Sequence, residues 1–103
     1  MKEALDKLDK VFENRIRLGI MSLLMVNEEV HFSVIKKNLG VSDGNLASHI
    51  KMLRKHEYID ETKTFLNRKP HTTYHATDLG KKAFQTHLDA LEQILKGYSQ
   101  SED

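Results

Sequence analysis

The chain has 103 residues, 30% of them charged and only 7% aromatic, with a net charge of +1. This length suits one domain with a single modest core, and the composition favours helices over an all-β sandwich. The longest apolar-rich run, "LGIMSLLMV", falls well short of the ~18 residues of a membrane span, and no signal-peptide pattern is visible. The absence of cysteine excludes disulfides and thiolate metal sites. We therefore expect a cytoplasmic protein that does not associate with membranes.

Charge is distributed unevenly along the chain. Residues 36–75 hold eight Lys or Arg against four Asp or Glu, a balance of +4, together with four of the six histidines. The other residues hold eight cations against eleven carboxylates, a balance of −3. A basic middle between acidic ends predicts a polyanion surface on one face, with chance clustering as the alternative explanation.

Residues 4–26 are predicted to be helical. Their apolar side chains recur at three- and four-residue steps with charges between them, as on one face of an amphipathic helix. Asn14 and Gly19 are the positions where this pattern could divide into two helices. A turn and a short β-branched piece, Val30 to Phe32, follow. The repeating apolar positions are Leu5, Leu8, Phe12, Ile16, Ile20, Leu23 and Leu24.

The stretch "SVIKKNLGVSDGNLASHIKMLRK" predicts a short helix, a tight turn and a longer helix. Ser33 is the expected N-cap of the first helix, and Gly40 stands where a left-handed residue would end it. Ser42 can cap the second helix, and the carboxylate of Asp43 suits its positive N-terminus. Residues 33–57 therefore follow the order of a helix-turn-helix.

The periodicity changes at Tyr58. "YIDETKTF" and "HTTYHAT" are rich in Thr and aromatic residues and alternate in twos, which predicts two strands. Asn67 and Pro70 favour a turn between them, with Arg68 and Lys69 at its tip. Pro70 has no N–H and so fits a turn or an edge position better than a central strand. Residues 58–76 are therefore expected to form a β-hairpin with a cationic end.

A last helix is predicted over residues 78–96. Thr77 is its expected cap, and Gly97 is expected to end it, with the following residues frayed. Its apolar positions are Leu79, Ala83, Phe84, Leu88, Leu91, Ile94 and Leu95.

The order of these elements resembles that of the winged helix-turn-helix transcriptional regulators of the MarR and ArsR type. The likeness rests on "NRIRLGIMSLL", "FSVIKKNLGVSDGNLASHIKMLRKHEYID" and "NRKPHTTYHATDLGKKAF", and it covers residues 12–95. It implies one mainly α domain over residues 1–103 with a small β-hairpin wing, in the order α-α-β-α-α-β-β-α. It also implies sequence-specific binding of double-stranded DNA by a homodimer, usually to repress transcription.

The side chains of the helix predicted after Ser42 suit a helix that enters a groove of DNA. With Leu46, Ile50 and Leu53 turned to the core, the opposite face carries small polar residues first and cations later. The major groove of B-DNA, about 12 Å wide, admits such a face, and lysines suit its phosphates. The residues expected to contact DNA from this helix are Ser42, Gly44, Asn45, Ser48, His49, Lys51 and Lys55.

Several of these positions have a structural alternative. Ser42 is a helix cap first, and Asn45 and Ser48 could be ordinary solvated residues. His49 borders the apolar stripe and could orient the helix by hydrogen bonding. In the wing, the resemblance implies that Arg68 and Lys69 enter the minor groove or contact the backbone. A solvated turn is the alternative there.

The two terminal helices carry more apolar surface than a domain of this size can easily bury. We therefore expect a twofold dimer whose reading helices lie about one DNA turn apart on a pseudo-palindromic site. The alternative is that the last helix folds only onto its own domain. The expected interface residues are Leu5, Leu8, Phe12, Phe84, Leu88, Leu91 and Leu95.

Neither catalysis nor a cofactor is expected, because the chain has no Gly-rich phosphate loop, metal-ligand spacing or nucleophile motif. The cysteine pair of ArsR-type metal sensors is missing, and His87 and Asp89 are poorly aligned on one helical face. A metal site from His71, His75 and His87 is conceivable only across a dimer.

Two rival functions remain open at this point. One is a winged-helix protein-interaction module without sequence-specific DNA binding. The other is a ligand- or pH-responsive regulator, suggested by the histidines near the reading unit. The sequence does not identify an operator, a regulated gene or a small-molecule effector.

Overall fold

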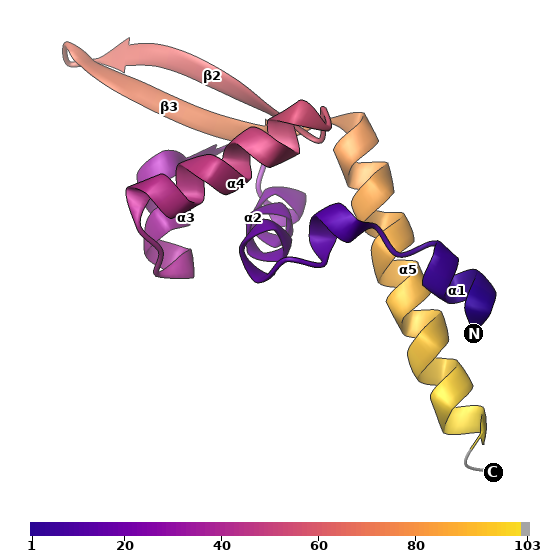
Figure 1. The fold of residues 1–103 in the computed structure, drawn as a ribbon. Coiled ribbons are helices and arrows are strands. Elements are labelled where there is room, and N and C mark those ends of the chain that lie inside the picture. The colour runs from indigo at the N-terminus through magenta and orange to yellow at the C-terminus, as the bar shows by residue number, and fades with distance from the viewer. Residues whose placement is uncertain (102–103) are drawn as a thin grey trace.

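The computed structural model describes the backbone of residues 1–101 and the side chains of residues 1–97 (Figure 1). The chain is mainly helical with a small antiparallel sheet, as predicted. Within the described residues, no helix has the length and apolar character needed to cross a membrane. The elements in order are α1 (Lys2–Asp6), the 3-10 helix η1 (Lys10–Phe12), α2 (Arg15–Val26), β1 (Val30–His31), α3 (Phe32–Leu39), α4 (Asp43–Lys55), β2 (Ile59–Leu66), β3 (Lys69–Ala76) and α5 (Asp78–Ser101).

Helices α2, α3 and α4 form the body of the molecule, from which two extensions project. The β2–β3 hairpin leaves one side of the body, and the long helix α5 leaves the other (Figure 1). Helix α1 packs against α5. The molecule is therefore elongated, with extents of 62 × 26 × 21 Å.

The core lies where α4 packs on α2. Leu46, Ile50 and Leu53 of α4 are 0, 4 and 0% exposed, as their spacing predicts. They lie in one buried cluster with Ile20 and Leu24 of α2. Phe12, Ile35, Ile59, Tyr74 and Phe84 extend this cluster to η1, α3, the sheet and α5.

The predicted helix over residues 4–26 is interrupted between Asp6 and Arg15. The side chain of Asp9 accepts the Val11 N–H at 2.9 Å and starts η1. Asn14 Oδ1 then accepts two backbone N–H groups, at 2.9 and 3.0 Å, and starts α2. Asn14 therefore marks a division, as the pattern allowed, but Gly19 does not. The side chains of Asp9 and Asn14 accept hydrogen bonds from N–H groups that a continuous helix would have paired internally. Each of them therefore favours a new helix start.

The helix-turn-helix is formed by α3 and α4. The predicted cap Ser33 and the predicted strand residue Phe32 are both wrong, because α3 begins at Phe32 and His31 is its N-cap. Nδ1 of His31 accepts the Ser33 N–H at 3.1 Å. The turn is as predicted, with Gly40 left-handed at φ 63° and ψ 43°. Ser42 Oγ accepts the Asn45 N–H at 3.2 Å and caps α4.

The sheet has the strand order β1-β3-β2. Leu66 pairs with Lys69, and the turn between them is Asn67–Arg68, with φ values of 52° and 64°. Positive φ at both central residues is the pattern of a type I′ hairpin turn. The turn is therefore tighter than predicted, because Lys69 and Pro70 belong to β3. Pro70 lies beyond the two residues of β3 that pair with β1, on a part of β3 that is open on that side.

Thr77 fixes the start of α5. Its hydroxyl accepts the Gly80 N–H at 2.9 Å and donates to the Glu57 carbonyl at 2.7 Å. The predicted end at Gly97 is wrong, because α5 continues to Ser101. Residues 102 and 103, which belong to the predicted frayed end, lie outside the described residues.

Gly80 provides a test of how tightly α5 joins the body. A Cβ at this position would lie 2.0 Å from the Tyr58 carbonyl oxygen, whereas a Cβ at Gly97 would meet nothing within 4 Å. Gly80→Ala should therefore destabilise the fold by roughly 1–3 kcal/mol, enough to lower Tm by about 5 °C or more. Gly97→Ala adds the same methyl group to the same helix and should leave Tm unchanged or slightly higher. Equal Tm values for the two variants in thermal unfolding would contradict this packing.

Candidate nucleic-acid interface

The outer face of α4 carries the residues that the sequence predicts for DNA contact. Gly44, Asn45, Ser48, Lys51 and Lys55 are all exposed, opposite the buried stripe. Small side chains stand in the first two turns and lysines in the last two. This face can therefore approach another surface closely at one end and neutralise negative charge at the other.

The N-terminal end of α4 is tied to α3. Ser42 is exposed but engaged as the helix cap. Oδ1 of Asp43 forms an ion pair with Nζ of Lys36 at a distance of 2.9 Å. This pair joins the two helices across the tight turn at Gly40. Since both side chains are substantially exposed, its net contribution to stability is small, about 0–1 kcal/mol.

His49 is half-buried and has a partner inside the protein. Its Nδ1 lies 3.0 Å from Nη1 of Arg17 on α2. The Nε of Arg17 also donates to the Val11 carbonyl at 2.7 Å. Burial, and then the nearby Arg17 cation, lower the pKa of His49 below its ordinary value of 6.5. Arg17 was not predicted from the sequence, where it is one of several charged positions on a predicted helix.

Three charged side chains meet between α4 and the wing. Glu61 of β2 accepts from Arg54 Nη1 of α4 at 2.6 Å, and Lys63 Nζ lies 3.3 Å from the other Glu61 oxygen. The Glu61 side chain is only 9% exposed. Two cations thus surround one shielded carboxylate, so the cluster keeps a net positive charge where the wing leaves the body.

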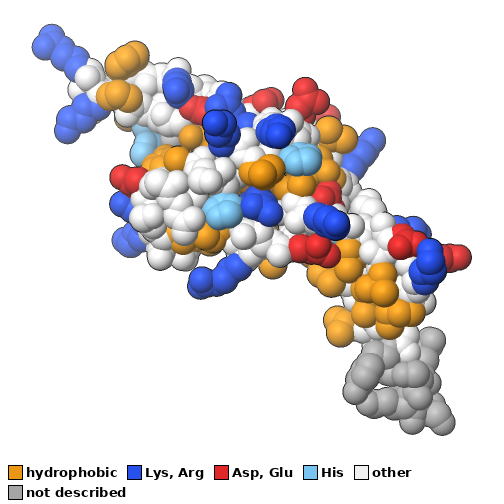
Figure 2. All heavy atoms as spheres, in the orientation of Figure 1, with side chains coloured by type: hydrophobic (Ala, Val, Ile, Leu, Met, Phe, Trp, Pro, Cys, Tyr) orange, Lys and Arg blue, Asp and Glu red, His pale blue; other side chains and the backbone are white. Residues whose placement is uncertain are grey.

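The tip of the wing is cationic and also apolar. Arg68 and Lys69 are exposed there, and Lys and Arg side chains extend from that end of the molecule (Figure 2). Phe65 and Leu66 beside them are 77% and 58% exposed. The exposure of these two residues was not predicted, because an antiparallel sheet commonly has one face packed on the core.

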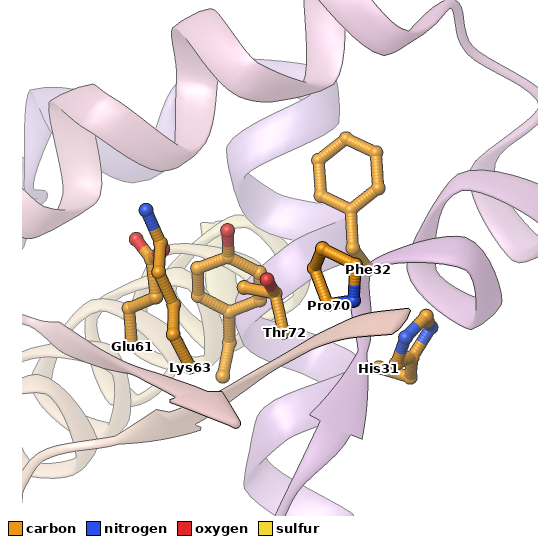
Figure 3. A pocket seen from close by; sticks show the side chains of 7 residues that line it. His31, Phe32, Glu61, Lys63, Pro70 and Thr72 are labelled. Atoms are coloured by element: carbon orange, nitrogen blue, oxygen red, sulfur yellow. The ribbon is translucent and has the colours of Figure 1, made fainter. Parts of the chain in front are cut away.

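An open groove of about 370 Å³ lies between the hairpin and the start of α3. Glu61, Lys63, Pro70 and Thr72 line its hairpin side, and Phe32 lines the helix side (Figure 3). His31 and Tyr74 complete the lining. The phenol of Tyr74 has a raised pKa, because it is buried and Glu61 is near, so it remains a neutral hydrogen-bonding group.

The terminal helices present part of the predicted apolar surface. Leu5, Leu88, Leu91 and Leu95 are exposed, and apolar side chains gather beside the far end of α5 (Figure 2). Leu8 is half-buried. Phe12 and Phe84, which were expected at a dimer interface, are each 2% exposed. That expectation is wrong, because their rings lie 5.0 Å apart edge to face within the chain's own core.

His87 is a structural residue and is closed to a metal ion. It is 3% exposed, and its Nδ1 accepts the Asp9 N–H at 3.0 Å. Asp9 Oδ2 accepts in turn from the Tyr58 hydroxyl at 2.6 Å. Burial, together with this hydrogen bond and the charge of Asp9, raises the pKa of Tyr58 to about 12. The conceivable metal site from His71, His75 and His87 is therefore not supported. Among the residues that the structure describes, no three His, Cys, Asp or Glu side chains come together as metal ligands.

The lowered pKa of His49 predicts a pH dependence of stability. Around pH 6.5 the folded chain binds fewer protons at this site than the unfolded chain does. The stabilising difference is fully present above pH 6.5 and is lost as the pH falls through 6.5 toward the folded-state pKa. Urea unfolding between about pH 8 and about pH 5 should therefore show a decline in the free energy of unfolding that is smaller in His49→Gln. The same decline in both proteins would contradict the effect.

Comparison with known proteins agrees with this geometry. Residues 16–95 match the family model of the winged helix DNA-binding domain. A transcriptional regulator homologue from Pyrococcus horikoshii OT3 is 32% identical, with 94% of each chain covered and a TM-score of 0.83. An uncharacterized protein of Methanocaldococcus jannaschii is 29% identical over 84% of this chain and 95% of its own length.

The fold is also similar to that of a putative MarR-family transcriptional regulator from Porphyromonas gingivalis W83. The TM-score is 0.60 and the identity 20%, with 84% of this chain and 80% of the other covered. At that identity the likeness concerns the fold alone. From the match over residues 16–95, the chain belongs to the winged helix DNA-binding domain family, and its fold is that of a transcriptional regulator.

Proposed function

We propose that this protein is a homodimeric transcriptional regulator, acting as a repressor, that reads a pseudo-palindromic DNA site. The observation that carries the proposal is the outer face of α4, which is free of the protein's own core over its whole length. In this proposal α4 enters the major groove and the wing contacts the minor groove or the backbone. A repressor of this kind acts by occupying its site.

Charge and size support the placement of α4. The side chains of Ser48 and Asn45 are short, so the helix can lie deep in the groove, where these side chains reach base edges. Lys51 and Lys55 follow on the same face, where a duplex offers phosphates. The net positive cluster of Arg54, Glu61 and Lys63 continues this charge to the base of the wing.

The exposed leucines of the terminal helices support a dimer. Leu91 and Leu95 lie one turn apart on α5, and Leu88 lies one turn before Leu91. Such a stripe on the described part of a long projecting helix suits a second copy related by a twofold axis. Two α4 helices would then face successive turns of the same groove.

The rival function is a protein-interaction module, and the exposed Phe65 and Leu66 of the wing favour it. Apolar side chains are common in the core of a protein–protein interface. Fluorescence anisotropy with a random duplex at low salt separates the two functions. The regulator should bind such a duplex with a strong salt dependence, and the interaction module should not bind it.

Ser48→Ala and Asn45→Ala should change which duplexes are preferred. A base contact that is lost costs about 1–3 kcal/mol at one position of the site and little on random DNA. Selection of duplexes from a random pool, followed by affinity measurements on selected and random sequences, tests this. Val26→Ala, an exposed position at the end of α2, is the control. If both groove variants select the same sequences as the wild type, these two side chains do not read bases.

Arg68→Ala combined with Lys69→Ala should weaken all duplexes alike. Loss of two phosphate contacts should lower the slope of log affinity against log salt by about two units. Lys2→Ala with Lys7→Ala removes the same charge from the other end of the chain, and its slope should match the wild type. Wild-type affinity in the wing variant at every salt concentration would exclude the wing from the interface.

Leu91→Glu with Leu95→Glu should give a monomer. The two new carboxylates of each chain would face those of the other chain across the proposed interface, where burying them without partners is costly. Sedimentation equilibrium should report the mass of one chain for the variant and of two for the wild type. Glu92 is also exposed on α5, and Glu92→Leu changes the charge of the helix while leaving the leucines in place. This control variant should remain dimeric. A wild-type monomer at micromolar concentration would contradict the dimer.

A further inference from the structure

We propose that Arg17 fixes the tautomer of His49, so that α4 presents the Nε2–H of His49 as a hydrogen-bond donor to an acceptor atom of the bound duplex. This inference rests on the proposed DNA-binding function and adds a residue, Arg17, that contacts no DNA itself. It assigns Arg17 as a positioning residue and His49 as a donor whose direction is set.

The assignment follows from the chemistry of the two groups. Nη1 of Arg17 lies 3.0 Å from Nδ1 of His49, a hydrogen-bond distance. A guanidinium has only N–H donors and keeps its charge in proteins, so Nδ1 must be the acceptor. A neutral imidazole carries one proton, which therefore resides on Nε2.

The position of Arg17 is itself fixed. Its Nε donates to the Val11 carbonyl at 2.7 Å, and its backbone N–H is bound by the Asn14 cap at 3.0 Å. The guanidinium therefore has little freedom to leave His49. Helices α2 and α4 pack directly against each other, and Arg17 and His49 join them by a hydrogen bond.

His49 is neutral in this arrangement. A protonated ring would lose the acceptor at Nδ1 and would place a second cation against the guanidinium. Burial and the Arg17 charge both disfavour the protonated ring, so they lower the pKa of His49. The neutral, Nε2-protonated ring is therefore the form that α4 carries at neutral pH.

The Nε2 atom is available to a partner. Within the described residues every buried side-chain nitrogen or oxygen has a hydrogen-bond partner, and Nε2 has none. Nε2 therefore reaches solvent. By the helical angle His49 stands beside Asn45 and Met52, on the flank of the outer face of α4.

A fixed donor at this flank discriminates between acceptors and donors on DNA. It suits the N7 of purines, the O6 of guanine, the O4 of thymine or a phosphate oxygen. The His49 ring cannot accept a hydrogen bond from the amino groups of adenine or cytosine, because its one acceptor atom, Nδ1, is engaged by Arg17. A histidine without Arg17 could exchange tautomers and meet either kind of group.

The first test needs no DNA. Long-range ¹H–¹⁵N NMR spectra of the full chain at neutral pH should show His49 with its proton on Nε2. In Arg17→Met, the pKa of His49 obtained from the same spectra should rise, because the guanidinium is gone. In Arg15→Met, which removes an equal charge from the neighbouring exposed position, it should stay close to the wild type. An Nδ1-protonated ring in the wild type, or an unchanged pKa in Arg17→Met, overturns the inference.

The second test asks whether Arg17 acts through His49. Arg17→Met should weaken binding to the selected duplex by more than twofold in the wild-type background, and by no more than the about 5- to 150-fold expected when the whole His49 contact is lost. In a His49→Ala background the same change should have at most about a twofold effect, since its target is gone. The lost contact to Val11 is common to both backgrounds and cancels. Equal effects in the two backgrounds overturn the role of Arg17.

The third test identifies the acceptor. Duplexes with 7-deazapurines lack the N7 acceptor, and duplexes with methylphosphonates lack phosphate charge at chosen positions. One such substitution should weaken wild-type binding but leave His49→Ala unaffected, and its type shows whether His49 meets a base or the backbone. If no substitution, thymine and guanine analogues included, separates the two proteins, His49 gives no hydrogen bond to DNA. A wild-type chain that binds no duplex overturns the proposed function as well, whereas duplex binding with an Nδ1-protonated His49 overturns this inference alone.

Discussion

The orientation of α4 depends on the burial of Leu46, Ile50 and Leu53 against α2 and the sheet. Each fully buried aliphatic side chain contributes about 1.5–3 kcal/mol, whereas an exposed ion pair such as Lys36–Asp43 contributes about 0–1 kcal/mol. Apolar contact therefore decides which face of α4 is turned outward, and the ion pairs at its ends only adjust it. Because the buried stripe runs the length of the helix, the opposite face is presented as a whole. The polar and cationic residues on that face do not take part in the core and are left for a partner.

Polar contacts then connect α4 to the elements outside the core. Arg17 joins the Val11 carbonyl in η1 to His49 in the middle of α4. Asp9, just before η1, binds both the Tyr58 hydroxyl beyond the end of α4 and, through its backbone N–H, His87 of α5. The segment that interrupts the predicted first helix is thus the junction between α5 and α4. A dimer formed through α5 would fix the spacing of two reading helices through this junction.

The features that the sequence predicted correctly are those decided within a few residues. The left-handed Gly40, the caps at Ser42 and Thr77 and the buried stripe of α4 each depend on chemistry within one or two helical turns. The features that it missed depend on distant partners. Phe12 and Phe84 share the apolar spacing of surface leucines, and only their contact across 72 positions of the chain makes them core residues. Likewise, nothing local marks Arg17 as the partner of His49, which lies 32 residues away.

Backbone amide NMR during titration with a duplex in low salt shows whether α4 and the wing face DNA together. We expect the shifted amides to form one surface made of residues 42–56 and the hairpin tip around residues 65–70. The described parts of α1 and α5 should shift little beyond what dimer formation causes. Shifts confined to the terminal helices, or spectra that the duplex leaves unchanged, would mean that α4 and the wing do not bind DNA.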